Sequence, residues 1–153
     1  GQMAAAGAVA WRVLEPFGCL EAVQDLAVQV IAETGAKAAI VAAHGSFKSP
    51  VPAAIAGRVA GMMAARGLRA AAGFIDQEPR LATLSGFGAD AVCLPYFAAE
   101  GGHVVDDIPA ALAEAGFQGR LLPALGLDAR VPGIIAEAVR EGRAVCAGAC
   151  RWG

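Results

Sequence analysis

Short apolar runs alternate with longer amphipathic stretches along this chain of 153 residues. The short runs suit buried strands, whereas apolar side chains three and four residues apart predict helices. The predicted strands are residues 8–14, 38–43, 68–75, 91–97 and 119–123, and the predicted helices are residues 20–33, 50–66, 78–87, 108–115 and 131–141. This alternation is typical of α/β proteins. The sequence therefore predicts a doubly wound, mainly parallel sheet of four to five strands flanked by helices.

Two histidines, the only ones in the chain, each follow one of the predicted strands. His44 comes directly after the run 38–43, and His103 lies a short loop beyond the run 91–97. The carboxyl ends of parallel strands meet at one edge of a sheet, where open α/β folds bind ligands. Two neutral imidazoles that converge there make a partial metal site with positions left open for a substrate. The alternative is that each histidine is a hydrogen-bonded loop residue.

The composition excludes several classes of function. The chain is 57% hydrophobic with a formal net charge of −2, and it lacks the clustered basic residues that bind nucleic acid. Charged residues, glycine or proline break every apolar stretch before it could span a bilayer. The alanine-rich start has no basic region of the kind that opens a signal peptide. We therefore expect a cytoplasmic protein with no nucleic-acid or membrane partner.

A similarity between two segments of the chain bears on the domain organisation. The segment 12–20, which leads into the first predicted helix, is similar to the segment 120–128, which leads into the last. We expect residues 35–143 to form one α/β domain, residues 1–34 to be the tail of a preceding repeat, and residues 144–153 to be a tail of small residues. The similarity of these segments could equally have arisen by chance between two strand–helix units.

Four motifs follow one another along the chain and together carry a resemblance. They are the apolar strand into His44-Gly45-Ser46, Gly73-Phe74-Ile75-Asp76 with Pro79 soon after, Leu94-Pro95-Tyr96-Phe97, and Gly101-Gly102-His103 with Asp106-Asp107-Ile108-Pro109. In this order they resemble the sirohydrochlorin cobaltochelatases of cobalamin biosynthesis, which are relatives of the ferrochelatases. The resemblance covers residues 38–141. It implies a chelatase fold of two similar α/β lobes, formed by one long chain or by two short subunits.

The resemblance also implies an activity. His44 and His103 would bind a divalent metal ion and assist its insertion into the tetrapyrrole. Co²⁺ is the expected metal, with Ni²⁺ and Fe²⁺ as alternatives, because imidazole is a good ligand for all three. Insertion requires the removal of two pyrrole N–H protons, and an imidazole that titrates near neutrality can accept one. The metal is a substrate in this reaction, and no organic cofactor is predicted. The alternative is a non-catalytic lobe that binds metal or tetrapyrrole.

Three carboxylates are candidates to act with the two histidines, because Asp76 is expected at the same sheet edge and Asp106 and Asp107 follow His103. Asp76 ends the predicted strand 68–75, where it could orient a histidine or transfer a proton, and a turn-forming role is the alternative. For Asp107 the sequence favours capping of the helix that begins near residue 108, since a carboxylate there accepts hydrogen bonds from free N–H groups. For Asp106 two roles stay open, namely capping of the helix and the relay of protons or metal to His103.

Sirohydrochlorin carries many carboxylates, so its binding cleft should offer cations and backbone N–H groups. The candidate substrate-binding residues are Ser46, Lys48, Arg80, Gly101 and Gly102. Each charged candidate could equally be a solvated surface residue. Where the resembled family usually has arginine after His-Gly-Ser, this chain has Phe47 and Lys48. Lysine does not form the bidentate contact that arginine makes with a carboxylate, which weakens the inference about the substrate.

Two further expectations concern cysteines and assembly. Cys146 and Cys150 could share a metal or form a redox pair, but without a second pair of ligands we interpret them as incidental. The four cysteines do not suggest a disulfide framework in so apolar a chain. A single lobe would expose the surface that faces its partner lobe. We therefore expect a homodimer, or association with a second lobe of a longer chain.

Overall fold

The apolar run 38–43 forms the central strand of the fold, β1 (Ala38–Ala43), in which every residue is buried. The computed structural model describes residues 11–146 and 150–152. The other strands are β2 (Arg69–Phe74), β3 (Val92–Pro95) and β4 (Arg120–Leu121). Their order in the sheet is β2-β1-β3-β4, and every pair is parallel. The predicted doubly wound parallel sheet is therefore confirmed, with four strands in the described part of the chain.

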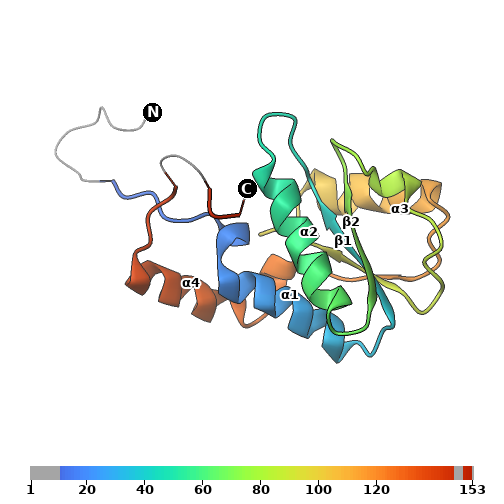
Figure 1. Ribbon diagram of the computed structural model, residues 1–153, viewed down its shortest axis with the longest axis horizontal. Helices are drawn as coiled ribbons and strands as arrows, with labels where there is room; N and C mark the ends of the chain where they lie inside the picture. Colours follow the sequence, from blue (N-terminus) through green and yellow to red (C-terminus); the bar gives the residue numbers. More distant parts are fainter. Residues whose placement is uncertain (1–10, 147–149, 153) are drawn as a thin grey trace.

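Helices cover both faces of this sheet (Figure 1). They are α1 (Glu21–Glu33), α2 (Val51–Ala64), α3 (Ile108–Glu114) and α4 (Val131–Glu141). The side chains of β1 alternate between two cores because successive residues of a strand point to opposite faces. Its odd-numbered residues pack with α1 and α2, and Ile40 and Ala42 pack with Ile108 and Leu112 of α3. The result is a three-layered α/β/α arrangement.

The helix predicted over residues 78–87 is wrong. The structure has only one short 3-10 turn there, η2 (Leu81–Thr83). The apolar spacing that suggested a helix still serves burial, because Leu81 is buried and Leu84 and Phe87 pack against the core formed with α3. The helical path cannot continue through Gly86, whose φ is +78°. The apolar spacing here therefore belongs to an irregular segment whose apolar side chains pack against the sheet and α3.

The first predicted strand, residues 8–14, is also wrong where it can be judged. Residues 8–10 lie outside the described residues, and residues 11–13 are not in a strand. Leu14 makes a single antiparallel bridge with Ala144 instead. The following α1 buries Val23 and Ile31 in the same core as the sheet. That residues 1–34 are the tail of a preceding repeat stays a prediction.

The strand order decides where a ligand can bind. The chain passes from β1 to β2 on one side of β1 and returns to β3 on its other side. The connections that leave the carboxyl ends of β1 and β3 therefore diverge to opposite faces of the sheet and leave a crevice between them. His44 follows β1, and His103 lies in the connection after β3. Within residues 11–146 and 150–152, none of the helices has the length and apolar character needed to cross a bilayer.

Candidate functional site

The structure brings the two histidines together at the crevice between β1 and β3. Their ring centroids lie 4.5 Å apart, and the rings meet edge to face with an interplanar angle of 82°. The ring of Phe97, which follows β3, lies 6.4 Å from that of His103. About half of each imidazole is exposed, with exposed fractions of 42% for His44 and 48% for His103. Both rings are therefore open to a ligand that enters from solvent.

His44 is held between its own loop and the end of β2. Its Nδ1 lies 3.0 Å from the carbonyl oxygen of Gly45, to which it can donate a hydrogen bond. Its Nε2 then carries the lone pair, and it faces Oδ2 of Asp76 at 3.5 Å. Asp76 is placed there by the parallel pairing of β1 and β2, and its N–H donates to the carbonyl oxygen of His44 at 3.0 Å. Two acceptors that face one another in this way suit a shared proton or cation.

Gln77, which the sequence analysis did not single out, links the two loops. Its Oε1 accepts a hydrogen bond from the backbone N–H of Ser46 at 2.6 Å. Gly45 between them has φ +80°, and a Cβ on this residue would lie 2.6 Å from Cγ of Gln77. The glycine therefore serves both a left-handed turn and a close approach. A His-Gly-Ser turn after a buried strand is the local sequence signal for this arrangement.

His103 lies in a short π-helix, η3 (His103–Asp107), that precedes α3. Its Nδ1 lies 2.6 Å from Oδ2 of Asp107, so the carboxylate accepts a hydrogen bond from the ring and leaves Nε2 free. The prediction that Asp107 caps the helix is wrong, because its side chain makes no capping hydrogen bond and binds His103 instead. The spacing of four residues on a helix was the signal for this contact. Asp106 is exposed, and its alternatives stay open.

Two open cavities flank the histidine pair. One, of 590 Å³, is lined by Asp76, Arg80, His103 and Asp107 among others, and is polar at the histidine end. The other, of 450 Å³, is largely apolar. Its lining residues include His44, Tyr96, Phe97, Ile55 and the turn η1 (Phe17–Cys19). His103 therefore borders the polar cavity, and His44 borders the apolar cavity.

The predicted substrate-binding residues are distributed unevenly around the site. Arg80 lines the polar cavity, although its guanidinium also donates to the carbonyl oxygen of Ile75. The hydroxyl of Ser46 accepts from the backbone N–H of Lys48 at 3.1 Å, and Lys48 itself is exposed beyond the cavities. Gly101 and Gly102 lie at the start of the π-helix, where the carbonyl oxygen of Gly101 accepts hydrogen bonds from residues 104 and 105.

The donor set near the crevice is small. Across residues 11–146 and 150–152, no group of three or more His, Cys, Asp or Glu side chains is arranged to hold a metal ion. Two imidazoles alone hold a divalent ion loosely and leave most of its coordination positions open. Such a site suits an ion that is passed on.

Comparison with known proteins agrees with this fold. The CbiX family model matches residues 38–142 of the chain. A solved structure of CbiX, the terminal enzyme for biosynthesis of siroheme in denitrifying bacteria, is 39% identical with a TM-score of 0.80. The match covers 85% of this chain and 62% of that one, so the chain spans less than two thirds of that enzyme. No curated protein matches.

Two further solved structures are similar. A CbiX protein from Marinobacter aquaeolei VT8 is 26% identical with a TM-score of 0.52, over 67% of this chain and 91% of that one. SirB from Bacillus subtilis with Fe³⁺ is 16% identical with a TM-score of 0.62, over 86% of this chain and 57% of that one. The second likeness is one of fold.

Proposed function

Because the chain belongs to the CbiX family of chelatases, we propose that it binds a divalent metal ion, Co²⁺ first, and inserts it into sirohydrochlorin or a related precorrin. The contact between His44 and His103 is the observation that carries the proposal. A metal ion about 2.1 Å from one nitrogen of each ring, at an angle near 90°, would set the centroids roughly 4.5 Å apart. The centroid distance of 4.5 Å is compatible with that arrangement.

The hydrogen bonds around the rings support distinct roles for the two imidazoles. Asp107 accepts the Nδ1–H of His103, so Nε2 of His103 can donate its lone pair to the metal. His44 and Asp76 face one another with two acceptors and can take up a proton. Metal insertion replaces two pyrrole N–H protons by one divalent ion, so a base beside the metal lowers the barrier. When the metal occupies Nε2 of His44, the carboxylate of Asp76 beside it is that base in this proposal, and His44 can accept a proton only before the metal binds or after it has left.

The two cavities support binding of a large, flat and acidic substrate between them. The apolar cavity beside His44 suits the macrocycle, and Arg80 in the polar cavity suits a carboxylate side chain. Ser46, Lys48, Gly101 and Gly102 at the rim complete the proposed substrate-binding residues.

Insertion of Fe²⁺ for siroheme is the second candidate function. The observation that favours it is the 39% identical structure, which is named for siroheme biosynthesis. Imidazole ligands do not discriminate among Co²⁺, Fe²⁺ and Ni²⁺ by affinity alone. A non-catalytic lobe is the third possibility, and the coverage of 62% of that enzyme is what favours it.

The test follows the absorption spectrum of sirohydrochlorin without oxygen as Co²⁺, Fe²⁺ or Ni²⁺ is added. Metallation by the unaltered chain is compared with the spontaneous rate and with a His44→Ala, His103→Ala double variant. Arg66→Ala, a change at an exposed position beyond α2, is the control. We expect acceleration that requires both histidines. If the unaltered chain binds the tetrapyrrole but metallation is no faster than the spontaneous reaction, the chain is not a chelatase, and the non-catalytic lobe becomes the better proposal.

A further inference from the structure

The apolar cavity beside His44 has one wall that lies outside the residues matched by the family model. That wall is η1, and residues 16–19 all line the cavity. Phe17 in this turn and Phe97 beyond β3 supply aromatic side chains to the same cavity as His44. Flat conjugated ligands bind well against aromatic side chains. The position of η1 therefore bears directly on what the cavity can bind.

Residues 151 and 152 fold back onto this turn. The indole Nε1 of Trp152 donates to the carbonyl oxygen of Cys19 at 2.9 Å, and the guanidinium of Arg151 donates to the same oxygen at 3.3 Å. The guanidinium of Arg58, on α2, lies over the indole ring of Trp152 at 4.7 Å from its centroid. Two side chains from one segment thus converge on one backbone oxygen of η1.

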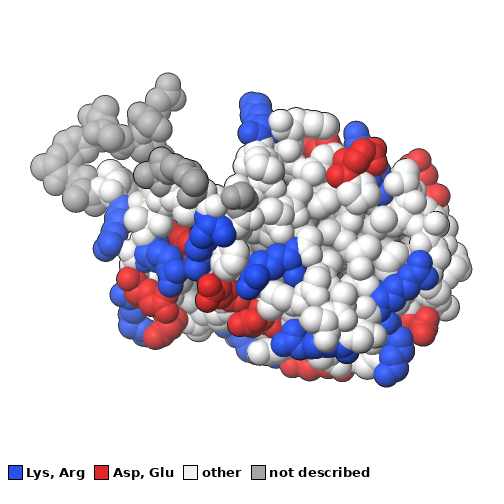
Figure 2. Space-filling model, in the orientation of Figure 1, with Lys and Arg blue, Asp and Glu red and all other residues white. Residues whose placement is uncertain are grey.

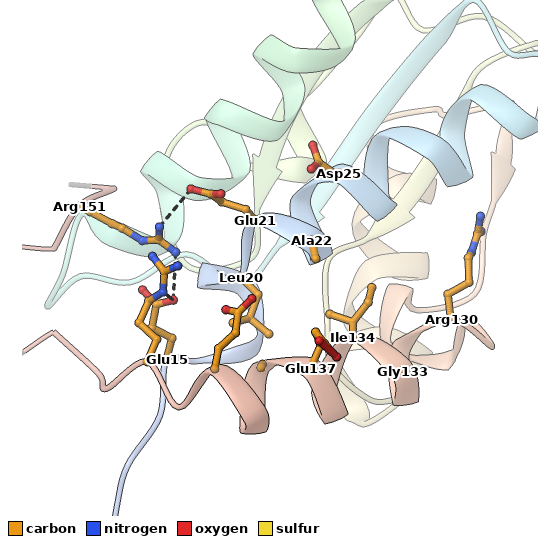
Figure 3. Close-up of a pocket in the computed structure, with 13 residues that line it drawn as sticks. Glu15, Leu20, Glu21, Ala22, Asp25, Arg130, Gly133, Ile134, Glu137 and Arg151 are labelled. Atoms are coloured by element: carbon orange, nitrogen blue, oxygen red, sulfur yellow. Dashed lines mark hydrogen bonds and ion pairs between the residues drawn. The ribbon is translucent and has the colours of Figure 1, made fainter.

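Arg151 is in turn fixed by two carboxylates. It lies 2.9 Å from Glu15 and 3.1 Å from Glu21, and Figure 3 shows its side chain directed toward both. The side chain of Glu15 is only 3% exposed, and Arg143 also approaches it at 3.6 Å. A buried carboxylate is stable only with cationic or hydrogen-bonding partners, so loss of Arg151 would leave Glu15 poorly compensated.

The opposite side of η1 is held by Tyr96, just after β3, and by Gln24 on α1. The hydroxyl of Tyr96 donates to the carbonyl oxygen of Gly18 at 3.0 Å, and burial raises the pKa of Tyr96, which keeps it a donor. The side-chain amide of Gln24 donates to the same oxygen at 3.4 Å, and Arg58 donates to the amide oxygen of Gln24 at 3.0 Å. The carbonyl oxygens of Gly18 and Cys19 are therefore both bound by side chains.

We infer that η1 is a wall of the tetrapyrrole cleft, with Phe17 in contact with the macrocycle, and that Arg151 and Trp152 are positioning residues that hold this wall. The inference rests on the proposed function, since it takes the tetrapyrrole as the occupant of the apolar cavity. The pair Arg151 and Trp152, named the clasp below, touches neither histidine in the described contacts. The clasp therefore acts on tetrapyrrole binding and leaves the metal site alone.

The experiment measures two dissociation constants for each variant, one for metal-free sirohydrochlorin and one for Co²⁺ alone. Trp152→Ala removes the indole of the clasp and leaves Arg151, and Trp152→Phe keeps an aromatic ring beside Arg58 but removes the N–H donor. Phe17→Ala removes the proposed contact itself. Trp11→Phe is the matched control, because Trp11 is the other tryptophan of the chain and is 65% exposed.

We expect Trp152→Ala and Phe17→Ala to weaken sirohydrochlorin binding about tenfold and Trp152→Phe to weaken it severalfold, while Co²⁺ binding stays within about twofold. In turnover the loss should fall on KM and spare kcat. Trp11→Phe should change neither constant. Clasp variants that keep full sirohydrochlorin affinity, or that lose both affinities together with thermal stability, would overturn the inference.

The outcomes also separate this inference from the proposed function. If the unaltered chain binds no sirohydrochlorin, both fail. If it binds and metallates sirohydrochlorin and the clasp variants do so equally well, only the clasp fails.

Discussion

A carboxylate lies beside each imidazole of the site. Asp107 lies one turn after His103 in the π-helix, and Asp76 reaches His44 from the end of β2. A carboxylate behind a ligating imidazole fixes which nitrogen carries the proton and increases the basicity of the other. Asp107 therefore orients His103 for the proposed metal, whereas Nδ1 of His44 is held by the carbonyl oxygen of Gly45 and Asp76 faces its other nitrogen.

The contribution of Asp107 can be measured by replacing its charge. Asp107→Asn keeps an oxygen that can accept from His103 but removes the negative charge. We expect it to weaken Co²⁺ binding at least about tenfold, the usual cost of losing a carboxylate behind a metal ligand, as measured by calorimetric titration. Asp106→Asn is the matched control, since it removes the same charge one residue away. Equal losses in both variants would show that net charge, and not the hydrogen bond, sets the affinity.

The turn at Gly45 makes a second prediction, on stability. Gly45→Ala places a methyl group in a left-handed conformation and against Gln77, so we expect it to lower the free energy of unfolding by about 2 kcal/mol or more. Gly57→Ala is the control, because Gly57 lies in α2 with open space around its Cα. That change should raise the free energy of unfolding by about 0.5–1 kcal/mol. Urea denaturation distinguishes the two, and a harmless Gly45→Ala would contradict the tight contact with Gln77.

Between helices, α1 and α4 are joined by an ion-pair network at the end of α1. Arg130, just before α4, lies 2.6 Å from Glu33 of α1 and 2.7 Å from Asp128. Hydrogen bonding to the Arg130 side chain lowers the pKa of Asp128 from its ordinary 3.8 to about 2. Figure 2 shows charged side chains of both signs gathered over the side of the molecule where α4 lies, whereas the surface over α2 is mostly uncharged.

This network predicts a pH-dependent stability. A carboxyl with a lowered pKa stabilises the fold fully above its ordinary pKa, and this stabilisation is lost as the pH falls from about 4 to about 2. Asp128→Asn should therefore lower the free energy of unfolding by about 1 kcal/mol at pH 7 and by much less at pH 2. Thermal unfolding followed across this pH range is the measurement. A difference that is independent of pH would assign the effect to packing.

The regular elements followed from the sequence, and the irregular ones did not. The strand 38–43 and the helix 131–141 have the predicted bounds, because the first is a continuous apolar run and the second has helical apolar spacing, and a clear stop follows each. The segment 78–87 has helical spacing but is fixed by contacts with α3 and the sheet, which no local pattern contains. The π-helix at His103 likewise depends on the position of α3 on the sheet.

The candidate site was predictable in its histidines and less so in their partners. The positions of both histidines at one sheet edge could be predicted, because each follows a strand in a pattern of alternating strands and helices. Asp107 was assigned to helix capping because a carboxylate at a helix start normally binds backbone N–H groups. Gln77 and the clasp depend on contacts between distant segments. Their roles, and those of Ser46, Lys48, Arg80, Gly101 and Gly102, stay proposals.

Considered whole, the molecule carries an apolar surface that the fold does not cover. Val13 and Val145 are adjacent through a backbone hydrogen bond of 3.1 Å and are 67% and 40% exposed. Ile135 and Val139 lie one turn apart on α4 and are 46% and 60% exposed. Both pairs belong to segments at one end of the molecule, namely α4 and the stretches 11–14 and 143–146 (Figure 1), and Figure 2 shows charged side chains of both signs over this end. Exposed apolar side chains among charged ones are typical of a surface that binds another protein.

We therefore predict that the chain forms a symmetric dimer through these four residues. A twofold axis would place each apolar pair against a copy of itself or of the other pair, which removes both from water at once. Val139→Lys should shift size-exclusion chromatography with light scattering from twice the monomer mass to the monomer mass, since it buries an unpaired charge at the centre of the contact. Ala113→Lys adds the same charge at an exposed position on α3, away from this surface, and should leave the dimer intact. A monomer at high concentration for the unaltered chain would contradict the dimer and leave the surface for a second lobe.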